Sequence, residues 1–264
     1  MRNLRRELRF LVALWKANLL SAMEFRATFI TQALGMMLND AVYFIFWVIF
    51  FDRFQLVRGW GLQDILLVYG LVAVSFGAAM YLFGNAQFVG DVISKGQLDY
   101  YLSLPRPVLL HLLASRSNMS GIGDALFGLV TFFFAGQVTL DAFARYLLGA
   151  MCSGVIFVAF LVLVQSLAFW LGDVPALNIA ATNAIITFAI YPSKLFEAGT
   201  RLLLFTLVPA LLVGAVPAEL VRGFTWGNAG MLVLGTLVFF LLAGGVFYRG
   251  LRRYESGSAI QIQS

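Results

Sequence analysis

Long runs of apolar residues, separated by short polar segments, dominate the chain. A helix that crosses the hydrocarbon core of a membrane needs about 20 largely apolar residues, because each residue adds about 1.5 Å to a core about 30 Å thick. Five runs approximately satisfy this requirement, and a sixth is shorter and contains Asn178 and Asn183. The six runs are residues 25–51, 64–89, 119–135, 146–171, 176–191 and 227–248. The pattern predicts an all-α membrane protein with six transmembrane helices.

Residues 200–217 are also apolar, but this run is short and Pro209 interrupts it. A helix that is broken at membrane depth is tolerated only where protein or a water-filled cavity surrounds the freed backbone. We therefore expect a re-entrant hairpin before the last transmembrane helix, and not a seventh span.

The basic residues favour one orientation. The six-span topology with a cytoplasmic N-terminus places twelve of them inside: Arg2, Arg5, Arg6, Arg9, Lys16, Arg26, Lys95, Arg106, Arg116, Arg249, Arg252 and Arg253. It places six outside: Arg53, Arg58, Arg145, Lys194, Arg201 and Arg222. This bias has the sense that the positive-inside rule requires. We therefore expect both termini, including a tail at 255–264, on the cytoplasmic side of a bacterial inner membrane that holds a domain of residues 23–254.

Residues 1–22 have the pattern of an amphipathic helix. At 100° per residue, one face carries Leu4, Leu8, Leu11, Trp15 and Leu19, and the opposite face carries Arg2, Arg6, Arg9 and Lys16. Such a helix lies in the membrane interface with its cations toward anionic lipid headgroups. The alternative is a helix that packs on its own protein.

Composition excludes several classes of protein. The chain is 61% hydrophobic and 12% charged, far from the composition of soluble domains. A single cysteine and a single histidine, Cys152 and His111, allow no intrachain disulfide and no metal cage of these residues. The net charge of +5 lies mostly near the chain ends, so it reflects topology and indicates no nucleic-acid partner.

No nucleotide-hydrolysing or other catalytic motif is visible. A phosphate-binding P-loop ends in Lys-Ser or Lys-Thr, whereas the three lysines here precede Ala17, Gly96 and Leu195. We therefore expect this chain to bind no cofactor or metal, and any ATP and Mg²⁺ to be held by a partner ATPase.

Polar residues inside the apolar runs are candidates for function, because charge at the bilayer centre is costly. Asn39 and Asp40 fall near the middle of the first span. A place on a translocation path and a structural hydrogen bond between helices both explain them. We expect the single amides Gln165, Asn178 and Asn183 to bond across helices, and Asn85 and Gln87 to be solvated at the interface.

The loop at 90–107 is the most informative segment outside the spans. Leu98, Tyr101 and Leu102 recur at i, i+3 and i+4, which predicts a short helix with an apolar face. The charged residues around that face are Lys95, Asp99 and Arg106. Two prolines then stop the helix and stiffen its exit. Such a helix suits docking into a groove on a partner, and the alternative is a helix that rests on lipid.

This loop carries a family resemblance. The run Gly96, Gln97, Leu98, Asp99, Tyr100, Tyr101, Leu102, followed by Pro105 and Pro107, resembles the G-x-L-D-x-x-L-x-x-P signature of a group of ABC-2-type ABC transporter permeases. The run from Tyr248 to Gly257 is similar to the usual ending of that group, and the length, basic start and spans agree along the chain.

The resemblance implies a transmembrane subunit that lacks its own ATPase. Two such subunits, identical or related, would sit on two P-loop ATPase subunits, and the loop that includes Lys95 would be the coupling helix. The function expected is ATP-driven export. A secondary transporter and a lipid-modifying membrane enzyme remain the alternatives.

Overall fold

The computed structural model describes residues 2–57, 59–136 and 138–255, and within them the side chains from residue 5 onward. These ranges are helical, with no β-strand beyond an isolated bridge between Val57 and Trp60. The helices are α1 (Arg2–Glu24), α2 (Arg26–Arg53), α3 (Leu62–Phe83), η1 (Gly84–Phe88), α4 (Val89–Ser94), α5 (Leu98–Leu102), α6 (Val108–Ala114), α7 (Ser120–Phe134), α8 (Leu140–Gln165), α9 (Ala168–Leu171), α10 (Pro175–Ala189), η2 (Ser193–Leu195), α11 (Ala198–Thr206), α12 (Ala210–Val213), α13 (Ala215–Arg222) and α14 (Trp226–Leu251).

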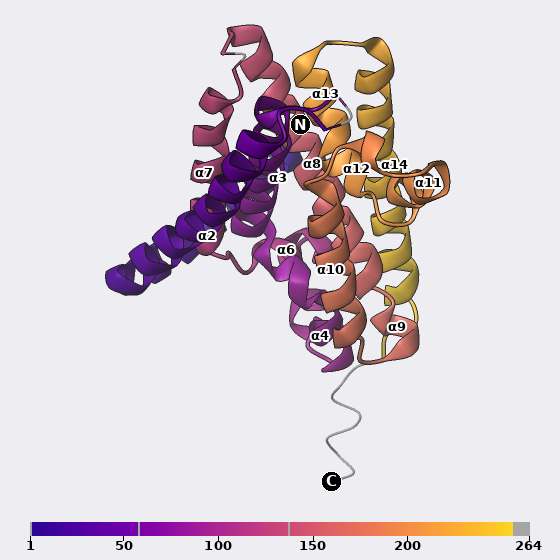
Figure 1. Ribbon diagram of the computed structural model, residues 1–264. Helices are drawn as coiled ribbons and strands as arrows, with labels where there is room; N and C mark the ends of the chain where they lie inside the picture. The colour runs from indigo at the N-terminus through magenta and orange to yellow at the C-terminus, as the bar shows by residue number, and fades with distance from the viewer. Residues whose placement is uncertain (1, 58, 137, 256–264) are drawn as a thin grey trace.

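Long apolar helices form the body of the molecule. Four helical stretches in the described part are long and apolar enough to cross a membrane: Arg26–Arg53, Leu62–Ser94, Leu140–Leu171 and Trp226–Leu251. Figure 1 shows α8, α10 and α14 running side by side, with α4 and α9 at one end and α13 at the other. The all-α membrane architecture expected from the sequence is therefore confirmed.

The predicted third and fifth spans are short in the structure. α7 and α10 contain 15 residues each, which corresponds to about 22 Å of helix, less than the thickness of the hydrocarbon core. The second span is longer than expected and is interrupted, because the 3₁₀ helix η1 separates α3 from α4. The count of six spans stays a prediction.

α3 and α7 pack with their backbones in contact. A Cβ at Gly128 would lie 2.5 Å from both the carbonyl oxygen of Gly70 and the amide nitrogen of Val74, and a Cβ at Gly77 would lie 2.5 Å from the amide nitrogen of Ala125. Small residues at such contacts let membrane helices approach closely. These glycines therefore fix α3, the most buried span, against α7.

α8 is the central helix of the second half. It packs against α14, α3, α13, α10 and α12. Near its start, Arg145 donates a 3.0 Å hydrogen bond to the carbonyl oxygen of Leu220, and a Cβ at Gly149 would lie 2.9 Å from Cβ of Pro217. The beginning of α8 is thus fixed to α13.

The segment predicted as a re-entrant hairpin is bent. Ala198–Thr206 and Ala210–Arg222 meet at 71°, with Pro209 at the break. The bend matches the break expected at 200–217, although α13 continues five residues further, to Arg222. Residues 210–218 are fully buried, so the broken backbone is surrounded by protein, as membrane depth requires.

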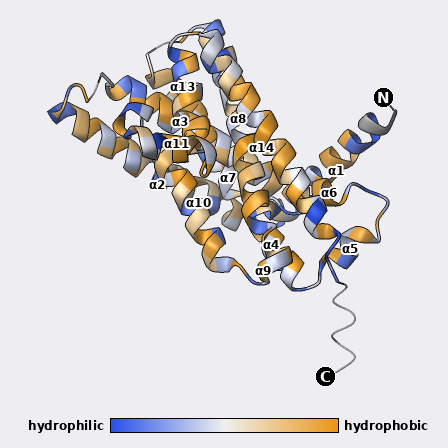
Figure 2. Cartoon of the chain, turned by 90° about the vertical axis from the view of Figure 1, so that its right-hand side faces the viewer, coloured by the Kyte–Doolittle hydropathy of each residue, from blue (hydrophilic) through white to orange (hydrophobic). Residues whose placement is uncertain are grey.

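α1 is helical, as predicted for residues 1–22, and part of it packs on the chain itself. Figure 2 shows it leaving the bundle sideways beside α6. Leu11 is buried, and the Trp15 indole N–H donates a 2.7 Å hydrogen bond to the carbonyl oxygen of Leu82. Leu8 stays exposed. The side chains of Arg2 and Leu4, and the predicted tail beyond residue 255, lie outside the described residues.

The glycine contact between α3 and α7 predicts the effect of adding one methyl group. Gly128→Ala should destabilise the protein by about 1–3 kcal/mol, because the new Cβ overlaps the α3 backbone, which has no side-chain freedom to yield. Gly244→Ala in α14 is the matched control, since its Cβ would meet nothing within 4 Å. Thermal unfolding in detergent measures both, and equal melting temperatures for the two variants would contradict the packing.

Candidate functional site

The segment from α4 to α6 lies at one end of the bundle (Figure 2), with apolar side chains of α4 and α6 in the hydrophobic core. Gly96 connects α4 to α5 with φ of +69°, a left-handed conformation that glycine adopts without strain. The amide of Gln97 closes this turn by donating to the carbonyl oxygen of Val92 at 2.9 Å. The turn between α4 and α5 therefore explains why the G-x-L-D run begins with glycine. The short helix predicted from the sequence is present as Leu98–Leu102.

The apolar residues of α5 that are exposed differ from those that the sequence predicted. Leu98 is 0% exposed and belongs to the hydrophobic core of the chain, so it cannot form part of an exposed docking surface. Tyr100 and Leu102 are instead 63% and 43% exposed. Of the three residues in the i, i+3, i+4 pattern, Leu98 and Tyr101 face the protein itself and Leu102 is exposed. We call Tyr100 and Leu102 the exposed pair.

Tyr101 holds α5 against α6. Its hydroxyl lies 3.0 Å from the Ser115 hydroxyl, and its ring meets the His111 ring edge-to-face at 5.2 Å. Asn85 from η1 completes this contact by donating to the carbonyl oxygen of Leu112 at 2.9 Å and to the Ser115 hydroxyl at 3.0 Å. Asn85 is therefore buried within the protein, and the prediction that it is solvated at the interface is wrong.

α1 covers the other side of α6. Arg106 forms a 2.9 Å ion pair with Glu7 and lies 4.5 Å above the Phe10 ring. The Phe10 ring contacts the buried His111 at 5.1 Å. Burial, and secondarily the charge of Arg106, lowers the pKa of His111, so the imidazole is neutral at physiological pH. This side chain therefore fills an aromatic contact and carries no charge.

The end of α14 reaches the same region. Tyr254, three residues after α14, lies near Asp99 of α5, and burial, followed by the charge of Asp99, raises the pKa of its hydroxyl. The Phe169 ring lies 5.6 Å from the Phe247 ring and occupies the space that a Cβ at Gly250 would need. The two sequence runs that carried the family resemblance are therefore neighbours in space.

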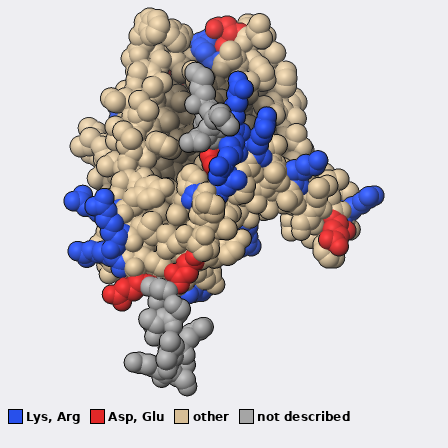
Figure 3. Space-filling model, turned by 180° about the vertical axis from the view of Figure 1, so that it is seen from behind, with Lys and Arg blue, Asp and Glu red and all other residues tan. Residues whose placement is uncertain are grey.

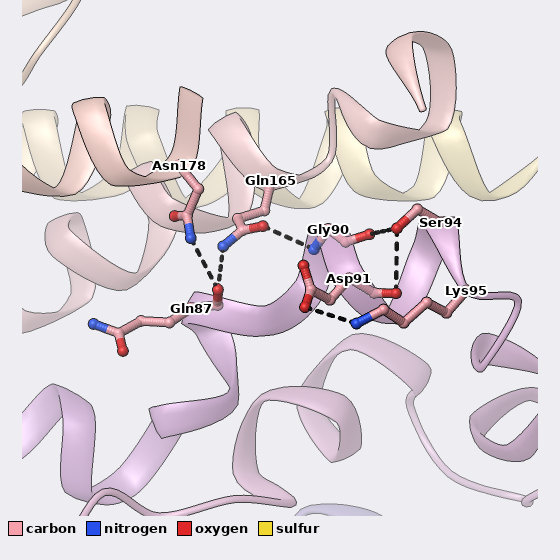
Figure 4. Close-up of polar contacts among 7 residues, drawn as sticks. All are labelled: Gln87, Gly90, Asp91, Ser94, Lys95, Gln165 and Asn178. Carbon is pink, nitrogen blue, oxygen red and sulfur yellow. Dashed lines mark hydrogen bonds and ion pairs between the residues drawn. The ribbon is translucent and has the colours of Figure 1, made fainter. Parts of the chain in front are cut away.

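A buried amide network joins α4 to α8 and α10 (Figure 4). The Gln165 side chain accepts a 2.8 Å hydrogen bond from the amide of Gly90 and donates to the carbonyl oxygen of Gln87. Asn178 donates to the same carbonyl oxygen at 3.1 Å. The prediction that Gln165 and Asn178 bond across helices is confirmed. Gln87 takes part through its carbonyl group, and its side chain points away from the network in Figure 4.

Asn39 and Asp40 are consecutive residues of α2 and point to different sides of the helix. Asn39 is exposed on the outer side of the helix, whereas Asp40 is 5% exposed and accepts a 2.9 Å hydrogen bond from the Tyr69 hydroxyl. The carboxyl group of Asp124 in α7 lies near that of Asp40, and one oxygen of each carboxyl group has no hydrogen-bond partner among the described residues. The bond from Tyr69 joins α2 to α3 and supplies the structural hydrogen bond that the sequence left open. Asn39 and Asp40 do not face one common surface.

An aromatic cavity of about 280 Å³ lies at the far end of α3 from α4. Its lining includes Trp47, Trp60 and Tyr191 and contains no charged side chain. Such a cavity can accommodate an apolar group. Across the described ranges, no group of three or more His, Cys, Asp or Glu residues could hold a metal ion.

Sequence reasoning missed the partners of the α4–α6 segment. Glu7 and Arg106 are 99 positions apart, and no local pattern connects them. The burial of Leu98 could not be predicted from the sequence either, because periodicity shows which residues share a face and not what that face contacts. Gln165 did leave a signal, since it is a lone amide at the end of a long apolar run.

The sequence model of the ABC-2 family transporter proteins matches residues 37–258, which include the α4–α6 segment and the end of α14. No curated protein and no solved structure matches the chain significantly. The match covers far more than half of the 264 residues. The chain therefore belongs to the ABC-2 family of transporter proteins.

Proposed function

We propose that the chain is the permease subunit of an ATP-driven exporter in a bacterial inner membrane, and that ATP is hydrolysed by a separate ABC ATPase subunit. The family match over residues 37–258 carries this proposal. The absence of a P-loop from the sequence requires the nucleotide and its Mg²⁺ to be held by the partner.

The α4–α6 segment is the proposed coupling element. Within it, α6 and the residues after α14 hold α5 in place and α1 packs on α6, while the exposed pair, Tyr100 and Leu102, stays uncovered. Lys95 and Asp91 form a 3.1 Å ion pair at its rim. Tyr100 and Leu102 are two positions apart, so they extend from different sides of α5, and each offers an exposed apolar side chain to a groove on a partner. This surface therefore suits an ATPase subunit better than it suits the lipid acyl chains.

The proposed topology keeps six spans with both termini cytoplasmic. α7 and α10 count as short spans, and the bent α11–α13 segment counts as a re-entrant element on the outer side. Figure 3 shows several groups of Lys and Arg side chains on one face of the molecule, and α1 carries Arg5, Arg6, Arg9 and Lys16. This distribution supports α1 as a helix at the inner interface, with its cations toward anionic lipids.

A second permease subunit, identical or related, completes the proposed transporter. The spans α2 and α14 are only 17% and 22% buried within the chain, so both leave large apolar faces. Lipid and a second subunit divide these faces between them. Asn39 lies on the exposed side of α2, where such a subunit would meet it, and this leaves Asn39 as the polar candidate for a path between subunits.

The proposed mechanism is mechanical. Closure of the ATPase dimer moves the groove that holds α5, and the movement passes to the spans that α4 and α6 contact. The spans then change between an inward and an outward arrangement. Net transport requires that the substrate bind one arrangement more tightly than the other.

The first prediction is that a negative charge placed on either residue of the exposed pair weakens coupling to the ATPase subunit. Tyr100→Glu or Leu102→Glu should weaken binding of the ATPase subunit at least about tenfold, because burying a carboxylate against an apolar groove costs several kcal/mol. The permease itself should fold normally, since both side chains are exposed. Pull-down of the ATPase from solubilised membranes measures the effect.

Gln97→Glu is the matched control, because it adds the same charge to an exposed position of the same segment and removes no apolar contact. Leu98→Glu is unsuitable as a test, because Leu98 is buried and its replacement destabilises the chain itself. Full ATPase binding by both Tyr100→Glu and Leu102→Glu would exclude α5 as the docking helix.

The isolated chain should hydrolyse no ATP, because it carries no P-loop. Phosphate release by the purified subunit, measured with Mg²⁺ and ATP, should equal that of a preparation from cells that lack the gene. Hydrolysis that co-purifies with the chain through every step would contradict the assignment of the nucleotide to a partner.

Cysteine labelling tests the proposed orientation. In a Cys152→Ala background, Arg53→Cys and Lys194→Cys should react with an impermeant maleimide in intact cells. Lys95→Cys and Arg253→Cys should react only after permeabilisation, because the positive-inside bias places them in the cytoplasm. Labelling of Arg253→Cys from outside would require an odd number of spans.

A further inference from the structure

The second span is broken at the point where it meets the coupling segment. Phe83 and Phe88 leave the helical conformation, with φ,ψ of −134°, 39° and −121°, 7°. Hydrogen bonding along the helix is therefore interrupted between α3 and α4. The break leaves the amide of Gly90 and the carbonyl group of Gln87 to be satisfied by other parts of the protein.

One side chain satisfies both groups. Gln165 is 2% exposed, and its amide contacts the Gly90 amide and the Gln87 carbonyl oxygen at the same time (Figure 4). Gly90 must be glycine for this contact, because a Cβ there would lie 2.5 Å from Oε1 of Gln165. The break is therefore fixed in position by the last residue of α8.

α8 connects this break to the bent helix at its other end. Gln165 ends the 26-residue helix, and Arg145 and Gly149, near its start, contact α13 at Leu220 and Pro217. A helix of this length spans about 39 Å. The two irregular elements of the membrane domain, the α3–α4 break and the α11–α13 bend, are thus joined by one continuous helix.

We propose that Gln165 is a positioning residue that transmits movement of the coupling segment through α8 to the bent α11–α13 segment. This inference rests on the proposed function and adds the route by which movement passes through the membrane domain. The Gln165 amide makes α4 and α8 move together, because both of its polar atoms would be left unpartnered if the two helices separated. Without it, α4 can follow the ATPase while α8 stays behind.

Gln165→Met tests the route, since it keeps the length and flexibility of the side chain and removes both hydrogen bonds. Gln87→Met is the matched control, because it removes a neighbouring amide side chain and leaves the Gln87 carbonyl group in the network. Both variants are placed in the complex with the ATPase, in a Cys152→Ala background in lipid nanodiscs. Nitroxide pairs are introduced at Gln97 with Arg253, near the coupling segment, and at Arg201 with Trp226, near the bend.

In the unmodified chain, ATP with vanadate should shift the distances of both pairs. In Gln165→Met the shift at Gln97–Arg253 should remain and the shift at Arg201–Trp226 should be lost, whereas Gln87→Met should retain both. Distances are measured well below the melting temperature of every variant. A purely structural role would lower the melting temperature and leave both shifts intact, and that result overturns the inference.

Failure of the proposed function gives a different result. An unmodified chain that binds no ATPase, or that shows no shift at Gln97–Arg253, overturns the function and the inference together. If Gln165→Met does not fold, Gly90→Ala tests the same contact, because the added Cβ would lie 2.5 Å from Oε1 of Gln165 and displace that side chain. It should reduce the shift at Arg201–Trp226, and a full shift there would overturn the inference.

Discussion

Every backbone amide and carbonyl group that leaves a helix at membrane depth must find a partner inside the protein, because lipid offers none. This constraint governs the two irregular elements of the chain. Gln165 and Asn178 satisfy the α3–α4 break, and burial of residues 210–218 encloses the bend before α13. The buried amide contacts of Gln165 and Asn178 therefore lie where the second span is broken.

The close packing of α3 and α7 has a complementary role. Glycine contacts hold these helices with their backbones touching, and Asp40 adds a polar link from α2 through Tyr69. By contrast, most of α2 and α14 remains exposed. The chain thus combines a tightly fixed centre with outer helices that are free to contact lipid or a second subunit, an arrangement suited to a subunit of a larger transporter.

The sequence predicted the helices better than it predicted their contacts. Apolar run length located α2 and α14 to within three residues and α8 to within six, and Pro209 marked the bend, because both signals are local. Leu98 was assigned to the wrong surface, because periodicity cannot distinguish a face toward a partner from a face toward the chain's own core. The ion pair of Glu7 with Arg106 and the proximity of Asp40 to Asp124 depend on tertiary structure alone.

The central claim is that the exposed face of α5 contacts an ATPase subunit. A photoreactive amino acid, p-benzoylphenylalanine, at position 100 tests this most directly, since Tyr100 is 63% exposed and aromatic. Irradiation of intact membranes, followed by mass spectrometry, should yield a cross-link to a P-loop ATPase. The same residue at Phe224, which is exposed near the start of α14, should yield none. Cross-links from position 100 to lipid alone would contradict the account.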